Sequence, residues 1–302
     1  MNAKIKIHEV GLRDGLQMEK TVVPTAIKIQ WSKKLIDAGI DILQLGSFVH
    51  PEKVPQMADT DFLFSYFNKK ENKPSKTILS GLVLNERGAE RALQSQVDLV
   101  CLGVSASETH SKKNTGMSSK EATFRIVNIA KDLIQKGVKV QASVQSAFGC
   151  GYEGYIPQEK VIEVVRKYLD AGIYNISLAD TAGHAFPSQV EELYGKVIEL
   201  EPKISLACHF HNTYGLGLAN CYSAIKMGVT SIETAVGGLG GCPFTKLATG
   251  NVCTEDLVHS LNRDKIRLDI NINNLIDLAK ELESYFNKSL PGYVYKTGII
   301  KY

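Results

Sequence analysis

The chain has 302 residues, of which 44% are hydrophobic and 22% are charged, the composition of an ordinary globular protein with ample core. Its length fits either two average domains or one (β/α)8 barrel of about 250 residues with insertions. The formal net charge of +3, without a concentrated basic run, argues against a nucleic-acid-binding protein and is compatible with an anionic small-molecule substrate.

Short β-branched segments alternate with amphipathic segments along the whole chain. Residues 4–10 alternate polar and apolar side chains and predict a strand, and residues 25–38, between Pro24 and Gly39, predict a helix. The predicted strands are residues 4–10, 40–46, 77–84, 99–104, 138–144, 174–178, 204–210 and 230–236. The helices paired with them are predicted at residues 25–38, 60–68, 86–94, 119–136, 158–171, 187–200, 216–227 and 254–261.

Eight strand–helix pairs without a domain break predict a closed α/β fold, the (β/α)8 TIM barrel. An open doubly wound sheet is the alternative, but it normally carries a glycine-rich nucleotide-binding turn after its first strand, which residues 11–15 (GLRDG) do not form. We expect one domain over residues 1–302. The barrel would occupy about residues 4–265, and an additional C-terminal helix and irregular tail would occupy residues 266–302.

The six cysteines and the lack of long apolar runs favour a cytoplasmic protein. The cysteines are scattered without a CxxC motif, as is typical of reduced thiols in a chain of this size. No apolar run is long enough to span a membrane, and a strand pattern begins within a few residues of the N-terminus. We therefore expect a cytoplasmic location and no membrane partner.

Residues 208–212 (CHFHN) place two histidines at the end of the seventh predicted strand. Residues two apart in a strand face the same side, so His209 and His211 project together and Cys208 is expected to pack on the opposite face. Two neighbouring imidazoles can bind one metal ion. The alternative is a pair of polar residues at a strand end with no metal.

The C-terminal ends of the strands carry the chemistry in TIM barrels. Asp14 follows the first predicted strand and Asn251 follows the eighth, so both are expected to lie near His209 and His211. A carboxylate, two imidazoles and an amide without a thiolate favour Mg²⁺ or Mn²⁺, with Zn²⁺ as the alternative. The alternative interpretation, without a metal, is that these are solvated polar residues at the rim of the barrel.

Four glycines in residues 237–241 (GGLGG) directly precede Cys242. Because such a run costs conformational entropy on folding, we interpret it as a loop that closes over a substrate and carries the thiol with it. A thiol near a metal and a cation can donate or accept a proton. An inert buried thiol and a phosphate-binding loop are the alternatives, although no Lys-Ser or Lys-Thr pair of a P-loop follows directly.

Six short segments share order, spacing and composition with one enzyme family. They are residues 9–17 (EVGLRDGLQ), 47–49 (SFV), 54–59 (VPQMAD), 177–181 (SLADT), 209–211 (HFH) and 240–243 (GGCP). With these segments the chain resembles the 3-hydroxy-3-methylglutaryl-CoA lyase family, within the wider group of metal-dependent TIM-barrel lyases and Claisen-condensing enzymes. The resemblance extends from Lys4 to about Leu261 and implies a TIM barrel with a divalent cation.

The resemblance also implies a role for individual residues. The implied metal ligands are Asp14, His209, His211 and Asn251. Arg13 would stabilise an enolate oxygen, and Cys242 would protonate the carbanion from the loop. Asp180 or His209 would remove the proton of the substrate hydroxyl. The residues expected to contact the substrate or its CoA moiety are Arg13, Lys20, Gln44, Ser47 and Asn114.

The chain departs from the typical lyase pattern at three positions. Gln44 stands where the lyases typically carry Glu, Asn212 stands where they usually carry Asp, and Leu12 stands where Pro is usual. Asn212 matches the condensing branch of the group. Replacing a carboxylate by Gln44 removes one unit of charge near Arg13, because an amide can form hydrogen bonds but cannot titrate.

The resemblance implies a divalent-metal-dependent lyase that cleaves 3-hydroxy-3-methylglutaryl-CoA, or a close β-hydroxyacyl-CoA, to acetyl-CoA and a keto acid such as acetoacetate. The partner is therefore an acyl-CoA thioester, and a homodimer is expected. Gln44 motivates two alternatives. One is a relative with another substrate, such as citramalyl-CoA, or one working in the condensing direction. The other is a catalytically reduced paralogue that binds CoA esters.

Overall fold

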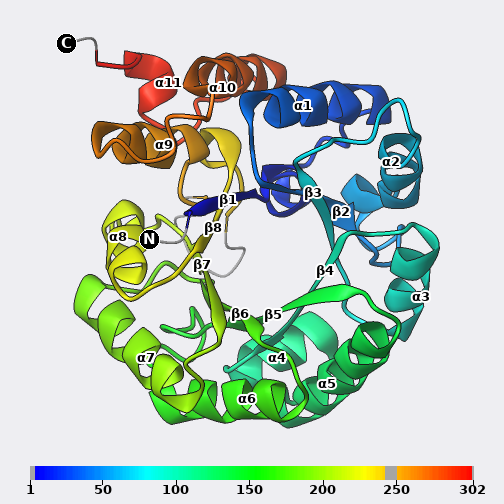
Figure 1. The fold of residues 1–302 in the computed structure, drawn as a ribbon, viewed down its shortest axis with the longest axis vertical. Helices are drawn as coiled ribbons and strands as arrows, with labels where there is room; N and C mark the ends of the chain where they lie inside the picture. The colour runs from blue at the N-terminus through cyan, green and yellow to red at the C-terminus, as the bar shows by residue number, and fades with distance from the viewer. Residues whose placement is uncertain (1–3, 242–249, 301–302) are drawn as a thin grey trace.

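The computed structural model describes residues 4–241 and 250–300, and within these ranges it contains a closed barrel of eight parallel strands (Figure 1). The strands are β1 (Lys6–Glu9), β2 (Ile42–Ser47), β3 (Ile78–Leu82), β4 (Leu99–Ser105), β5 (Lys139–Gln145), β6 (Asn175–Asp180), β7 (Ser205–Phe210) and β8 (Ser231–Thr234). They pair in sequence order, and β1 closes the barrel by pairing with β8. The predicted TIM barrel is confirmed.

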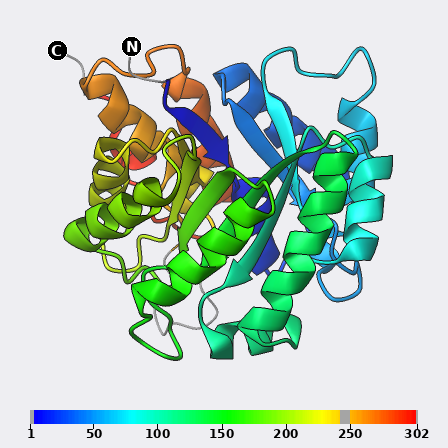
Figure 2. The ribbon, with the colours of Figure 1, turned by 60° about the horizontal axis from the view of Figure 1, so that its bottom comes forward.

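Helices surround the barrel (Figure 1), and the tilted view in Figure 2 shows them packed along its outside. The helices that follow β1 to β8 are α1 (Thr25–Ala38), α2 (Thr60–Phe67), α3 (Glu86–Gln94), α4 (Glu108–Thr115), α5 (Ser119–Gln135), α6 (Gln158–Asp170), α7 (Pro187–Leu200), α8 (Gly217–Lys226) and α9 (Thr254–Arg263). Helix α4 has no counterpart in the sequence-based prediction. Among the described residues, no helix combines the length and the apolar character needed to cross a lipid bilayer.

The two faces of the barrel wall differ in chemistry. Alternate strand residues such as Ile7 and Leu43 belong to a large apolar core shared with the helices, for example with Trp31 of α1. The inward face is more polar. Gln141 of β5 donates a hydrogen bond of 2.6 Å to Glu233 of β8, and because β5 and β8 are not neighbours, this bond crosses the barrel interior.

The C-terminal segment is anchored against the barrel helices. Helix α10 (Ile272–Phe286) packs on α1, where the indole of Trp31 meets the Tyr285 ring at 5.2 Å and donates a hydrogen bond of 2.9 Å to Glu281. The short helix α11 (Val294–Thr297) begins where the Asp256 carboxylate accepts the backbone N–H of Val294 at 2.7 Å. The additional C-terminal helix is confirmed as α10, whereas the tail after it is not wholly irregular, because it contains α11.

Candidate active site

A π-helical turn, η1 (Gly11–Gly15), follows β1 where the sequence predicts a plain polar turn. The Val10 carbonyl accepts three successive backbone N–H groups, from Arg13 at 3.0 Å, Asp14 at 2.7 Å and Gly15 at 3.5 Å. Isolated π-helical turns of this kind occur frequently at functional sites. This turn brings the side chains of two consecutive charged residues to the carboxyl end of the barrel.

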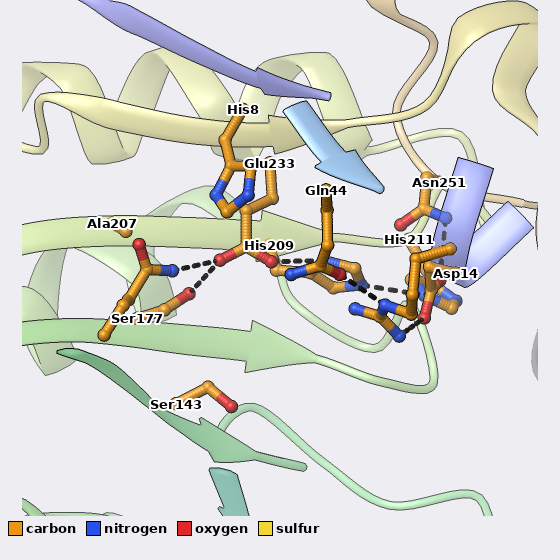
Figure 3. A network of polar contacts seen from close by, with 12 residues as sticks. His8, Asp14, Gln44, Ser143, Ser177, Ala207, His209, His211, Glu233 and Asn251 are labelled. Atoms are coloured by element: carbon orange, nitrogen blue, oxygen red, sulfur yellow. Dashed lines mark hydrogen bonds and ion pairs between the residues drawn. The ribbon is translucent and has the colours of Figure 1, made fainter. Parts of the chain in front are cut away.

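The four predicted metal ligands lie together at this end (Figure 3). The Nε2 atoms of His209 and His211 are 3.1 Å apart, and His211 Nε2 is 3.9 Å from Asp14 Oδ2. The Asn251 amide donates to Asp14 Oδ2 at 2.9 Å and to the Leu239 carbonyl at 3.0 Å. Residues from the turn after β1, from the carboxyl end of β7 and from the segment after β8 therefore converge, as the barrel topology predicts.

This donor set fits a divalent cation. Asp14, His209 and His211 each offer a ligand atom, and these atoms lie within 4.8 Å of one another. Two ligand nitrogens about 2.1 Å from one ion at a right angle are about 3 Å apart, close to the spacing of the two Nε2 atoms. The buried Asn251 Oδ1 has no hydrogen-bond partner within the described part of the chain, so an acceptor oxygen remains available beside the other three.

The glycine-rich segment lies directly against these ligands. Gly240 has a φ of +112°, and a Cβ at this position would be 2.6 Å from the Asn251 amide nitrogen. Gly237 and Gly238, at φ +66° and +70°, also occupy the left-handed region. Backbone geometry and close approach therefore account for these glycines. Cys242, the predicted proton donor of this loop, lies outside the described residues.

Arg13 is held between two side chains. Its Nη1 pairs with Asp14 and its Nε donates a hydrogen bond to the Gln44 amide oxygen. Burial by itself would raise the pKa of Asp14, but the positive charge of Arg13 and the two nearby histidines lower it far below its ordinary value. Asp14 is therefore an ionised carboxylate, the form in which it can bind a cation.

Glu233 of β8 is a site residue that the sequence-based prediction missed. Its Oε2 lies 3.0 Å from Nδ1 of His209. Burial opposes ionisation, but the hydrogen bond and charge of His209 lower the pKa of Glu233 to about 2. Burial lowers the pKa of His211 to about 4, whereas the pKa of His209 is raised because Glu233 outweighs its burial. The sequence signal that could have identified Glu233 is the presence of a glutamate within a predicted buried strand.

A cavity of about 510 Å³ opens at this end of the barrel. Some of the predicted site residues line this cavity and others do not. Among the described residues, Arg13, Asp14, His209, His211 and Asn114 line it, together with Gln145 and Glu233. Asn114 reaches it from the unpredicted helix α4. Lys20 is exposed and Ser47 is buried against the Leu82 carbonyl, and neither belongs to the lining.

Asp180, at the end of β6, is engaged by the loop that follows it. Its two carboxylate oxygens accept the backbone N–H groups of His184 at 2.8 Å and Ala185 at 3.1 Å. Burial raises the pKa of Asp180 to about 7, although these hydrogen bonds oppose the shift. A carboxyl group with a pKa near neutrality can both accept and return a proton.

Known proteins share both the sequence and the fold of this chain. It is 35% identical over 288 residues to "Hydroxymethylglutaryl-CoA lyase YngG" of Bacillus subtilis, with 95% of each chain covered. It is 36% identical over 286 residues to a Pseudomonas aeruginosa protein named 3-hydroxy-3-isohexenylglutaryl-CoA/hydroxy-methylglutaryl-CoA lyase, covering 95% of this chain and 94% of the relative.

The same relationship holds in three dimensions. The structure of an HMG-CoA lyase from Acinetobacter baumannii in complex with coenzyme A and 3-methylmalate superposes with a TM-score of 0.91 at 37% identity, covering 98% of this chain and 95% of that one. Residues 4–282 match the family described as HMGL-like. The chain belongs to the HMGL-like family.

Proposed function

We propose that this protein is a divalent-metal-dependent lyase that cleaves 3-hydroxy-3-methylglutaryl-CoA, or a close β-hydroxyacyl-CoA, to acetyl-CoA and a keto acid such as acetoacetate. The observation that supports this most directly is the convergence of Arg13 with Asp14, His209 and His211 on one cavity. Relatives that carry the lyase name cover nearly the whole chain, and one of them was solved with coenzyme A.

Asp14, His209, His211 and Asn251 would hold the cation. We propose Mg²⁺ or Mn²⁺, because hard oxygen donors and imidazoles without a thiolate suit these ions, and Zn²⁺ is the second choice. A cation held by these residues would lower the pKa of the substrate hydroxyl and so favour loss of its proton.

The protein's own residues would then complete a retro-Claisen cleavage. Asp180, rather than the predicted metal ligand His209, takes the hydroxyl proton, the new carbonyl forms, and the electron pair of the broken carbon–carbon bond moves into the thioester enolate. The guanidinium of Arg13 stabilises the enolate oxygen, because it stays charged at every cellular pH. Cys242 donates a proton to the enolate carbon, which yields acetyl-CoA.

Further contacts and properties belong to the same proposal. Asn114 at the cavity supports an assignment to CoA binding. Lys20, Gln44 and Ser47 are proposed as additional substrate or CoA contacts, although none of the three belongs to the cavity lining, and Gln44 is connected to it through its hydrogen bond to Arg13. We also propose a homodimer and a cytoplasmic location.

The alternative to this function is a lyase that cleaves a CoA thioester with a different acyl group. Gln44 beside Arg13 favours it, as does the Pseudomonas aeruginosa relative whose name includes a 3-hydroxy-3-isohexenylglutaryl-CoA substrate. A citramalyl-CoA lyase, a condensing enzyme and a catalytically reduced CoA-ester-binding paralogue belong to the same set of alternatives.

The test is a panel of β-hydroxyacyl-CoA thioesters with product analysis by mass spectrometry. The purified protein is stripped of metal by a chelator and then assayed with Mg²⁺, Mn²⁺ or Zn²⁺. We expect acetyl-CoA and acetoacetate only after a cation is restored, and no turnover of any thioester with any metal would refute the proposal. Cys242→Ser should retain metal binding and lose about 100-fold in kcat, the size expected for loss of a positioned proton donor.

A further inference from the structure

One of the two ring nitrogens of His209 already has a hydrogen-bond partner within the protein. Its Nδ1 lies 3.0 Å from Glu233 Oε2, inside the barrel (Figure 3). Its Nε2 is 3.1 Å from His211 Nε2, on the side of the cavity. The ring therefore presents one nitrogen to a carboxylate and the other to the site of the ligand atoms.

Glu233 is itself held in place by two neutral donors. Its Oε1 accepts a hydrogen bond of 2.6 Å from Gln141 on β5 and one of 3.0 Å from Ser177 on β6. Both donors act on the same oxygen, which leaves Oε2 for His209. Donors on β5 and β6 therefore hold the carboxylate of Glu233, on β8, so that its Oε2 faces Nδ1 of His209.

The second histidine lacks such support. Nδ1 of His211 is buried, and it has no hydrogen-bond partner within residues 4–241 and 250–300. The two histidines, which alternate on one strand and were equivalent in the sequence, thus differ in how firmly they are oriented. A buried carboxylate is costly unless it is paired, so its placement behind one histidine calls for a specific role.

We propose that Glu233 is a positioning residue that holds His209 in the Nδ1–H tautomer and thereby presents its Nε2 as a preorganised metal ligand. This inference rests on the proposed function only in taking a divalent cation as the ligand of the site. Carboxylates that orient metal-binding histidines typically contribute about 10–100-fold to metal affinity. Gln141 and Ser177 act one step further back, by holding Glu233.

Mn²⁺ affinity of the whole protein, measured by calorimetry without substrate, tests the proposal. Glu233→Met removes the acceptor at similar volume and should weaken Mn²⁺ binding about 10–100-fold. Glu233→Gln keeps an acceptor oxygen and should restore part of this loss. Ser177→Ala removes one of the two donors to Oε1 and leaves the contact between Oε2 and His209, so it should weaken Mn²⁺ binding less than Glu233→Met does.

A purely structural role for Glu233 gives a different result. In that case Glu233→Met would lower the melting temperature and leave the Mn²⁺ affinity of the folded protein unchanged, which would overturn the proposal. Nitrogen-15 NMR of the Mg²⁺-loaded wild-type protein adds a measurement that requires no variant to fold. We expect a proton on Nδ1 of His209, and a proton on Nε2 instead would also overturn the proposal.

The outcome also separates this inference from the proposed function. Mn²⁺ affinity that depends on Glu233, without any lyase turnover, would uphold the inference and remove the proposed function. Equal Mn²⁺ affinities with turnover intact would remove only the inference, and a wild-type protein that binds no Mn²⁺ would overturn both.

Discussion

Two buried arginines occupy opposite ends of the barrel, and their surroundings differ. At the amino end, Arg267 pairs with Asp41 at 2.6 Å and Asp269 at 2.9 Å, and it donates to the Ile5 carbonyl at 2.6 Å. At the carboxyl end, Arg13 pairs with Asp14 and Gln44 but also lines the cavity.

An arginine–aspartate pair has a structural role at the amino end and lines the candidate site at the carboxyl end. Asp41, directly before β2, also accepts the backbone N–H of Ile7 at 2.9 Å, so the Arg267 cluster ties β1, β2 and the C-terminal segment together. Arg13 faces open volume that a ligand can fill. We therefore expect substitutions at the amino end to change stability and substitutions at the carboxyl end to change turnover, in line with the division of roles in TIM barrels.

The largest expected effect is that of Arg13→Met. Removing a fixed positive charge from a developing oxyanion typically costs about 100–1000-fold in kcat, so we expect a loss near the upper limit. Steady-state kinetics, normalised to the folded protein, measures this loss, because Asp14 also loses its guanidinium partner and the variant is expected to be less stable. A variant that unfolds early but turns over normally when folded would reverse the contrast between the two ends.

Arg267→Met should have the opposite signature. It leaves the buried carboxylate of Asp41 without its guanidinium partner, which typically destabilises a protein by about 3 kcal/mol or more. Urea denaturation measures the free energy of unfolding, while kcat per folded molecule should remain at the wild-type value. The Lys4→Ala variant provides a control, because the Lys4–Asp41 pair at 3.2 Å is half exposed on the lysine side and should contribute less than about 1 kcal/mol.

Gln44→Glu sharpens the comparison with a smaller effect. A carboxylate beside Nε of Arg13 would place a second negative charge on a guanidinium already paired with Asp14. If the site is adapted to a neutral partner, kcat/KM should fall several-fold, about 1 kcal/mol in transition-state energy. A large gain in lyase rate would instead indicate a catalytically reduced protein.

The pH dependence of stability at the carboxyl end of the barrel should depend on Glu255. Glu255 accepts the backbone N–H of Gly237, and burial raises its pKa to about 8 from an ordinary 4.5. Because the pKa of Glu255 is higher in the folded than in the unfolded state, its contribution to the stability of the folded state is complete at a pH below its unfolded pKa of 4.5. This contribution is lost as the pH rises from 4.5 through 8.

Thermal unfolding of the metal-free protein between about pH 5 and pH 9 tests this, with Glu255→Gln as the comparison. The melting temperature of the wild-type protein should fall relative to that of the variant as the pH rises. Parallel curves for the two proteins would show that Glu255 does not titrate in this range.

Much of the fold and of the candidate metal site could be predicted because the signals are local. The alternation of strand and helix patterns identified the barrel, and the spacing of His209 and His211 placed them on one face of β7. Helix α4 was missed because its residues are mostly polar. Its ends nevertheless carry recognisable capping signals, since Ser107 accepts the backbone N–H of His110 at 3.1 Å and Gly116 adopts φ +75°.

The sequence by itself determined the barrel, the family and the residue types that gather at the candidate site, because periodicity, spacing and short motifs are properties of neighbouring residues. Only the tertiary structure decided which groups meet across the barrel. Glu233 faces His209, and Gln141 reaches Glu233 from a strand that is not adjacent to β8. Such contacts depend on the closure of the sheet and on the register of its strands, which cannot be predicted from the pattern of neighbouring residues.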